Sequence, residues 1–294
     1  MKQFFLSSSL VSLVGGLFLL TGCNDASSTS SVDNKAPSSV EPDASASAQK
    51  PAAESKKVST TQAEPTEPKK PSLTLSTPPK FKEFAAGPPR KQAFFDFMAP
   101  LIHQANQQVM QKRARLQSLI NAQTLSQNDQ AWLIEEGDLY GLEDLNPKKP
   151  ADLKALLIRM DIVPTALALA QAANESAWGT SRFARQANNY FGQWCFSKGC
   201  GLIPKQRNKG AIHEVRAFDH PYYSVKSYIH NLNSHRTYAQ LRKIRAQLRQ
   251  QKQPLTGLKM TEGLVNYSAR KHEYVEELQS MIRYNKLTQY NQKS

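Results

Sequence analysis

The chain has 294 residues, of which 39% are hydrophobic and 21% charged, with 38 Lys and Arg against 24 Asp and Glu for a net charge of +14. This length excludes a single minimal domain and allows a hydrophobic core of ordinary size. Residues 81–294 hold 30 of the basic and 17 of the acidic residues, and so +13 of the net charge. Such a basic domain suits an anionic surface, such as cell wall, lipid head groups or nucleic acid.

Residues 1–22 have the pattern of a signal peptide. Lys2 forms a short positive region, and the apolar run that follows is short for a membrane span and has no flanking charge cluster. The run ends in Leu20-Thr21-Gly22-Cys23, which resembles the bacterial lipobox, in which the Cys is lipidated and becomes the new N-terminus. A plain signal peptide with an incidental Cys is the alternative. We predict lipidation of Cys23 and a lipid bilayer as one partner.

Export to the periplasm follows from this assignment, and it argues against a nucleic-acid partner. Asn24 follows the Cys, where an Asp would indicate retention at the inner membrane. The outer membrane is therefore favoured.

Residues 23–80 contain the lipidated Cys and a stretch without any aromatic residue, in which Ser, Ala, Pro, Thr, Lys and Glu dominate. Too little apolar surface is present to offset the entropy of the chain, so we predict a disordered leash. A mucin-like stalk is the alternative and implies the same exposure. The folded domain is expected over residues 81–294, as a monomer.

Helical periodicity begins soon after Phe81. The helices expected in the first half of the domain are 92–122, 130–141, 151–160 and 164–174. Pro100 should kink or interrupt the first helix, and Asn128 or Asp129 should cap the second. The fourth helix is apolar or small on all sides, which is typical of the central helix of a domain.

The second half of the domain begins with an irregular, glycine-punctuated stretch, 190–218, whose last six residues alternate as a short strand does. Helices are expected again over 223–235, 238–251 and 271–285. The basic run 242–249 is interpreted as the solvated face of an amphipathic helix. The fold class is therefore α+β, mainly helical with a small β-insertion.

Glu175 stands out because it lies at the end of the apolar helix. A carboxylate buried there costs free energy unless it has a partner or a use. Burial raises the pKa of a carboxyl, as a general acid near neutral pH requires. A helix-capping or salt-bridging role is the structural alternative.

Two segments together carry a family resemblance. Glu175-Ser176-Ala177-Trp178-Gly179 is followed by Asn189-Tyr190-Phe191-Gly192. This pattern resembles the glucosaminidase family of peptidoglycan hydrolases, glycoside hydrolase family 73, over roughly residues 90–290. The resemblance implies a lysozyme-like fold and an endo-β-N-acetylglucosaminidase that cuts the β-1,4 bond after N-acetylglucosamine in peptidoglycan glycan strands. Lytic transglycosylases share the Glu-Ser pair, so they are the alternative enzyme, and a non-catalytic glycan-binding lipoprotein is the alternative outside enzymes.

The resemblance also assigns site residues. It implies that Glu175 is the catalytic acid and that Tyr267 lies near the reacting centre. The second carboxylate that glycosidases usually need is Glu214, which aligns better, or Asp219. The residues expected to bind substrate are Trp178, Asn189, Tyr190, Phe191 and Trp194, although Phe191 and a neighbour would also suit the core.

The remaining cysteines, Cys195 and Cys200, form an even pair in an exported chain, where a short-loop disulfide is natural. A zinc site would need four ligands, and no second Cys or His pair has suitable spacing. The six His form no ligand cluster in the sequence. We therefore expect a disulfide and neither a metal nor a cofactor.

Overall fold

The computed structural model describes residues 76–205, 207 and 210–291. The expected signal peptide, Cys23 and the leash up to residue 75 lie outside the described residues. Within the described part, no helix combines the length and the apolar character that a membrane span requires.

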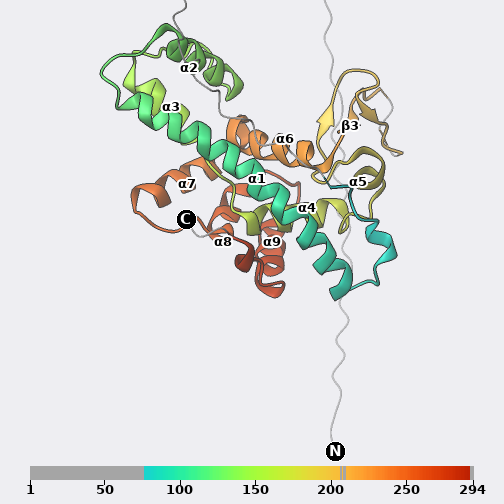
Figure 1. Ribbon diagram of the computed structural model, residues 1–294. Coiled ribbons are helices and arrows are strands. Elements are labelled where there is room, and N and C mark those ends of the chain that lie inside the picture. Colours follow the sequence, from blue (N-terminus) through green and yellow to red (C-terminus); the bar gives the residue numbers. More distant parts are fainter. Residues whose placement is uncertain (1–75, 206, 208–209, 292–294) are drawn as a thin grey trace, which may run out of the picture. The chain divides into compact units, whose positions relative to one another are not determined.

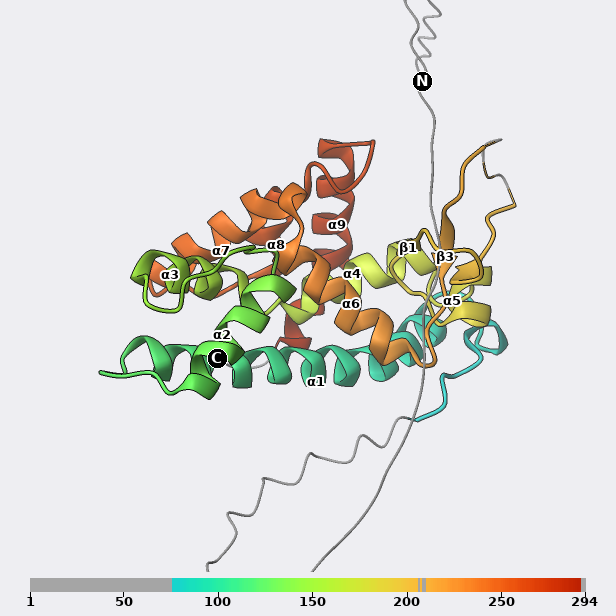
Figure 2. The same ribbon diagram turned by 90° about the horizontal axis from the view of Figure 1, so that it is seen from above.

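The domain is mainly helical with a small antiparallel sheet, as expected (Figures 1 and 2). The α-helices are α1 Pro88–Ile120, α2 Gln127–Leu139, α3 Pro150–Arg159, α4 Thr165–Ser176, α5 Arg182–Ala187, α6 Pro221–Ser234, α7 Ala239–Gln250, α8 Gly257–Met260 and α9 His272–Tyr284. The short 3-10 helices are η1 Phe81–Glu83, η2 Arg236–Tyr238, η3 Thr261–Leu264 and η4 Leu287–Tyr290. The strands are β1 Trp194–Cys195, β2 Gly201–Leu202 and β3 Glu214–Arg216.

The longest helix, α1, differs from expectation at Pro100. The helix begins at Pro88, where proline fits the first turn, and it continues past Pro100 to Ile120. Of the two outcomes expected at Pro100, a kink or a break, the break is wrong, because the packed face of α1 outweighs one lost backbone hydrogen bond. Its first half packs into the main core, and Leu116 packs into a second, smaller core with α2 and α3.

The N-terminal cap of α2 also differs from expectation. Ser126, rather than Asn128 or Asp129, is the cap, and its Oγ accepts a hydrogen bond from the Asp129 backbone N–H at 3.1 Å. Ser126 Oγ donates in turn to Asp129 Oδ2 at 2.7 Å. Asp129 thus supports the cap from the third helical position, as an acidic residue does in a capping box.

The apolar helix α4 is the centre of the domain, as predicted. Every residue from Thr165 to Ala173 is buried. The helix lies between α1 and α9 and contacts both (Figures 1 and 2). Its position explains its composition, because no face of α4 over these residues meets solvent.

The sheet is small and has the order β1-β3-β2, with all pairs antiparallel. The sheet lies beside α5 at one end of the domain (Figures 1 and 2). Gly201 pairs with Arg216, and a Cβ on it would lie 1.9 Å from the Val215 carbonyl oxygen. Only glycine therefore allows β2 to approach β3 this closely.

The basic helix α7 corrects the expectation of a solvated face. Arg242 and Arg245 are buried, and Arg245 is 1% exposed. Its guanidinium donates to the carbonyls of Ile158, Arg159, Asp161 and Ile162, at 2.9 to 3.1 Å. These bonds hold the link between α3 and α4, because arginine has enough donors to satisfy several carbonyls at once.

Candidate active site

Glu175 lies in the last turn of α4, and the chain leaves the helix through an unusual turn. Ala177, Trp178 and Gly179 all have positive φ, at 50°, 58° and 74°. Ser176 stabilises this turn, since its Oγ donates to the Ala172 carbonyl at 2.6 Å and accepts from the Gly179 N–H at 2.9 Å. Residues 176–179 therefore form the turn that ends α4, directly after Glu175.

Gly179 and Trp178 anchor this turn to the rest of the domain. A Cβ on Gly179 would lie 2.3 Å from Phe81 Cδ2. The Trp178 ring is half-buried and packs edge-on against Phe94 and Phe95 of α1. The structure thus gives Trp178, which was expected to bind substrate, a packing position beside α1.

The Glu175 side chain is exposed, whereas the sequence suggested burial. The surrounding protein still removes part of its hydration and raises its pKa, and the charge of Glu277 acts in the same direction. A hydrogen bond from Tyr274 Oη to Glu175 Oε1, at 2.8 Å, opposes this rise, as does the charge of Arg270. The net result is a carboxyl that is accessible and holds its proton to a higher pH than an ordinary Glu.

A chain of buried hydrogen bonds leads to this carboxylate. Tyr228 Oη donates to Gln171 Oε1 at 2.5 Å, and Gln171 Nε2 donates to Tyr274 Oη at 3.0 Å. Tyr274 then donates to Glu175. Each donor points toward the carboxylate, so the bonds polarise one another in one direction.

Tyr267 joins this chain to the segment after α5. Its ring stacks on Tyr274, with centroids 5.4 Å apart and planes 3° apart. Its hydroxyl donates to the Phe191 carbonyl at 3.3 Å. The negative charge of Glu175 is one of the influences that raise the pKa of Tyr267, after burial and the neighbouring Tyr274. The structure therefore brings Tyr267 and Glu175 together.

The residues Asn189, Tyr190 and Phe191 are all buried. Asn189 donates to the carbonyls of Gln193 and Arg216 and accepts from the N–H groups of Phe191 and Gln193. Phe191 stacks on Tyr228 with centroids 3.9 Å apart. Tyr190 and Phe191 therefore belong to the main core, and Asn189 connects this segment to β3 through the Arg216 carbonyl.

The same site lies inside a family match. Residues 151–287 match the glucosaminidase family, described as mannosyl-glycoprotein endo-beta-N-acetylglucosaminidase. The chain is also 33% identical to Protein bax of Escherichia coli K12 over 214 residues, which are 73% of this chain and 76% of that protein. The chain belongs to the glucosaminidase family. No solved structure matches it.

Family membership makes this a glycosidase-type domain, and the match contains Glu175, Gln171, Tyr228, Tyr267 and Tyr274. Helices α1 and α2 lie before the matched range. The tyrosine-glutamine chain is therefore part of the glucosaminidase domain itself.

Trp194 is the exposed aromatic residue among those expected to bind substrate. It is 58% exposed, and its ring stacks on His213 with centroids 4.2 Å apart. Tyr190, in contrast, packs against Phe81 and Phe94. In this glucosaminidase domain, Trp194 is thus the most exposed of the aromatic residues expected to bind substrate, with one face of its ring against His213.

Glu214 is buried, and both its oxygens are occupied. They accept from the N–H groups of Gly199 and Gly201, at 3.0 and 2.8 Å. These two bonds lower the pKa of Glu214. Asp219 is exposed, and its carboxylate forms no hydrogen bond or ion pair with any described residue.

The segment that contains Gly199 and Gly201 is also linked to β1 by the expected disulfide between Cys195 and Cys200. The sulfur atoms and a Glu214 oxygen lie within 4.8 Å of one another. Because the two sulfurs are bonded to each other, neither is a thiolate that could bind a metal.

Sequence reasoning missed Tyr274, Gln171 and Tyr228. One signal was present for Gln171, which is the polar exception in the apolar run of α4 and lies four residues before Glu175, on the same face of the helix. Tyr274 is 99 residues from Glu175 in sequence, and no local pattern connects the two.

Proposed function

We propose that this protein is an exported peptidoglycan hydrolase, an endo-β-N-acetylglucosaminidase that uses Glu175 as its general acid. The observation that carries the proposal is the Glu175 carboxyl, accessible at the end of the central helix, with a raised pKa and a hydrogen bond from Tyr274. It lies in the part of the chain that matches the glucosaminidase family.

The hydrogen bond from Tyr274 supports different tasks for the two oxygens of Glu175. Oε1 accepts the hydrogen bond from Tyr274. Oε2 is therefore the atom that carries the proton and gives it to the glycosidic oxygen as the bond to N-acetylglucosamine breaks. The raised pKa keeps this proton in place closer to neutral pH.

For the second carboxylate we propose Glu214 rather than Asp219. Its lowered pKa keeps it ionised, as a base or an electrostatic partner of a cationic transition state requires. Its two bonds to backbone amides must loosen for it to act directly. The alternative route uses the acetamido oxygen of the substrate, which such a carboxylate need only orient.

The occupied oxygens of Glu214 favour a second candidate function, a lytic transglycosylase. In that reaction Glu175 acts alone, first as acid and then as base, and leaves an anhydro-muramyl end. Digestion of purified sacculi, followed by mass measurement of the new ends, separates the reactions because hydrolysis adds one water. Anhydro ends would replace the hydrolase proposal, and absence of any new end would reject both.

The carboxylate assignment has its own test. Glu214→Gln should lower the turnover of sacculi more than Asp219→Asn does, with circular dichroism and urea unfolding as checks on the fold. A larger loss in Asp219→Asn would move the role of second carboxylate to Asp219.

The location is also a proposal. The lipobox-like run ending at Cys23 supports a lipid anchor in the periplasm, and Asn24 favours the outer membrane. Cys23→Ser should release the protein from membranes, because no other strong source of membrane affinity is evident in the sequence. It should leave turnover on isolated cell wall unchanged, since every proposed chemical group lies after residue 80. Continued tight membrane association in fractionation would reject the anchor.

A further inference from the structure

Exposed apolar side chains meet at one end of the small sheet. The last residue of β1 pairs with the first residue of β3, and the last residue of β2 pairs with the second. The chain segments that follow β1 and β2 therefore lie at the same end of the sheet as the segment that enters β3. Phe196 follows β1, Ile203 follows β2, and Ile212 lies two residues before β3. We call these three residues the apolar tip.

The apolar tip faces away from the helices. Its three side chains are 65%, 55% and 68% exposed, in the order of the sequence. The opposite end of β3 leads to α6 and the main core. The described part of the connection between β2 and β3 extends beyond the helices at the edge of the domain (Figures 1 and 2). Single exposed apolar residues are common, but three large ones from converging segments indicate an interaction surface.

The charges around the apolar tip are cationic. Lys198, Lys205 and Arg207 belong to the same segments, and none forms an ion pair with a described residue. The only acidic residue in the sequence 194–216 is Glu214. It is buried, with both oxygens bonded to backbone N–H groups. The surface near the tip is therefore positive and attracts an anionic partner.

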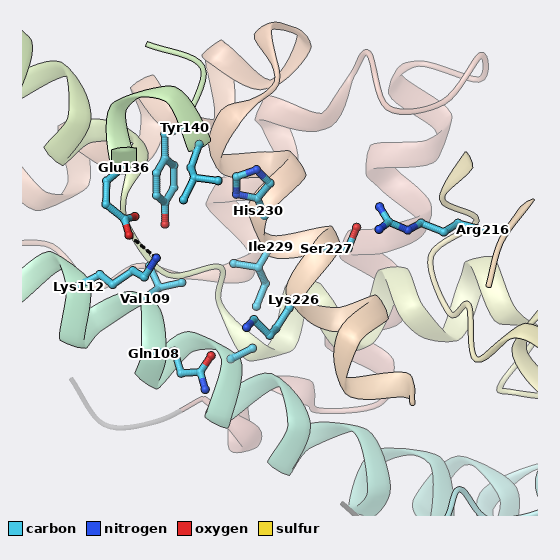
Figure 3. A pocket seen from close by; sticks show the side chains of 12 residues that line it. Gln108, Val109, Lys112, Glu136, Tyr140, Arg216, Lys226, Ser227, Ile229 and His230 are labelled. Atoms are coloured by element: carbon cyan, nitrogen blue, oxygen red, sulfur yellow. Dashed lines mark hydrogen bonds and ion pairs between the residues drawn. The ribbon is translucent and has the colours of Figure 1, made fainter. Parts of the chain in front are cut away.

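A lysine at the other end of the domain shows the contrast. Lys112 lines a cavity of about 400 Å³ between α1, α2 and α6, and it forms an ion pair there with the buried Glu136 (Figure 3). Its charge is compensated within the fold. The cations beside the apolar tip have no such partner among the described residues, so they remain available to a partner outside the domain.

The first described residues join the domain beside the same sheet. His220, four residues after β3, donates a hydrogen bond from Nε2 to the Ser76 carbonyl at 2.9 Å. The chain that leads back to Cys23 therefore joins the domain at the base of the sheet. A lipid on Cys23, proposed above, keeps the domain within reach of a bilayer and attaches it on the side that carries the tip.

We propose that the apolar tip docks on an anionic lipid bilayer. Phe196, Ile203 and Ile212 enter the boundary between head groups and acyl chains, and Lys198 and Lys205 meet the head groups. Two of the three tip residues are branched and aliphatic, and such side chains gain free energy by leaving water rather than by hydrogen bonding to a glycan. A contact of three side chains is weak and salt-dependent, so the proposed lipid on Cys23 remains the source of tight association.

Vesicle binding by the unlipidated chain is the first test. Residues 23–294 carrying Cys23→Ser, without the predicted signal peptide, are mixed at low salt with vesicles of phosphatidylglycerol and phosphatidylcholine in equal parts. Flotation measures the bound fraction. Phe196→Ser should weaken binding about tenfold, because one large apolar side chain no longer leaves water, and Ile212→Ser should also weaken it.

Ile134→Ser is the matched control, at an exposed isoleucine of α2. It should bind the vesicles as the parent does, and circular dichroism checks that all variants keep the fold. Equal binding by Ile212→Ser and Ile134→Ser, or no binding by the parent, would overturn the proposal. Neither lipidation nor cleavage enters these measurements, so failure of the proposed function or of the anchor would leave their result unchanged.

The charge of the bilayer is the second test. Lys198→Gln should weaken binding about fivefold, the effect of one lysine near an anionic surface. Lys243→Gln, at an exposed lysine of α7, should bind as the parent does. Binding by the parent should fall as salt is added. Equal binding to vesicles of phosphatidylcholine alone would overturn the assignment to anionic lipid.

A glycan strand is the competing partner. The same chains, with Glu175→Gln added so that the glycan is not cut, are sedimented with purified sacculi. Phe196→Ser should leave the bound fraction unchanged. Binding to sacculi that depends on Phe196, without binding to vesicles, would overturn the proposal and assign the apolar tip to the glycan.

Discussion

Two polar networks in this domain each contain a carboxylate, and the pKa values of the two carboxyls shift in opposite directions. Glu175 ends a chain of neutral groups, Tyr228, Gln171 and Tyr274, and its pKa is raised. Asp161 lies among three arginines instead, and its pKa is lowered.

The difference shows that exposure alone does not set the charge state of a carboxyl. Asp161 is 2% exposed, and burial by itself would raise its pKa. A hydrogen bond from Arg249 and the charges of Arg245 and Arg113 outweigh that effect. Glu175 is far more exposed, but one tyrosine hydroxyl does not compensate for its lost hydration. Lost hydration keeps the proton on Glu175 although its neutral partner Tyr274 opposes this, whereas the cationic partners of Asp161 outweigh burial and remove the proton.

The largest expected effect is on catalysis. Glu175→Gln should lower the turnover of sacculi by about 10²–10⁴-fold, because the proton donor is lost. Its stability should be unchanged or slightly higher near neutral pH. A carboxyl with a raised folded pKa stabilises the fold only at low pH, and this contribution is lost as the pH rises. Turnover near the parent value, or an unfolding free energy in urea well below that of the parent, would contradict the proposed role.

In the charged network around Asp161, a substitution should lower stability and leave catalysis unchanged. Asp161→Ala leaves Arg245 buried without its counter-charge, which should cost about 3–5 kcal/mol of unfolding free energy. The measurement is urea unfolding, with turnover of the folded fraction unaltered. Glu83→Ala is the control, because the Lys80–Glu83 pair is exposed and such pairs contribute at most about 1 kcal/mol. Equal stability of both variants would show that the arginines need no counter-charge.

The pH dependence of stability gives a second test of the lowered pKa of Asp161. Because the folded pKa of Asp161 is lowered, its contribution is present above the unfolded value of about 3.9 and is lost as the pH falls through the folded value. Asp161→Asn should flatten this acid-side loss in urea unfolding followed between neutral and acid pH. A parent whose stability does not fall on acidification would contradict the assignment.

The neutral chain is tested at its bond to the carboxylate. Tyr274→Phe removes a hydrogen bond that favours the ionised form of Glu175, so the pKa of Glu175 should rise further. The alkaline limb of the pH–rate profile should therefore move to higher pH. Loss of positioning should lower kcat by roughly tenfold. Tyr284→Phe, at an exposed tyrosine, is the control, and an alkaline limb that stays in place would separate Tyr274 from Glu175.

The smallest effect is expected at the distal end of the chain. Tyr228→Phe leaves Gln171 Oε1 buried without its donor, which should cost about 1–3 kcal/mol of stability. Its kcat should fall less than that of Tyr274→Phe, because three hydrogen bonds in series connect Tyr228 to Glu175. A larger loss of kcat in Tyr228→Phe would indicate that the chain acts as one unit.

Local patterns in the sequence were enough to predict the mainly helical fold, the central position of α4, and the Cys195–Cys200 disulfide. Each of these depends on residues close together in the chain: an apolar run of helical length, or two cysteines separated by four residues. The same patterns selected Glu175, whose catalytic role stays a prediction.

Only the tertiary structure decided which groups surround that carboxyl and which basic residues are buried. Tyr274 meets Glu175 because α9 packs against α4, and Arg245 is buried because α7 packs over the link between α3 and α4. A tyrosine or an arginine on an amphipathic helix has the same local pattern whether it meets solvent or a buried partner. The partner comes from a distant part of the chain, so the charge state of each carboxyl is determined only after the helices have packed.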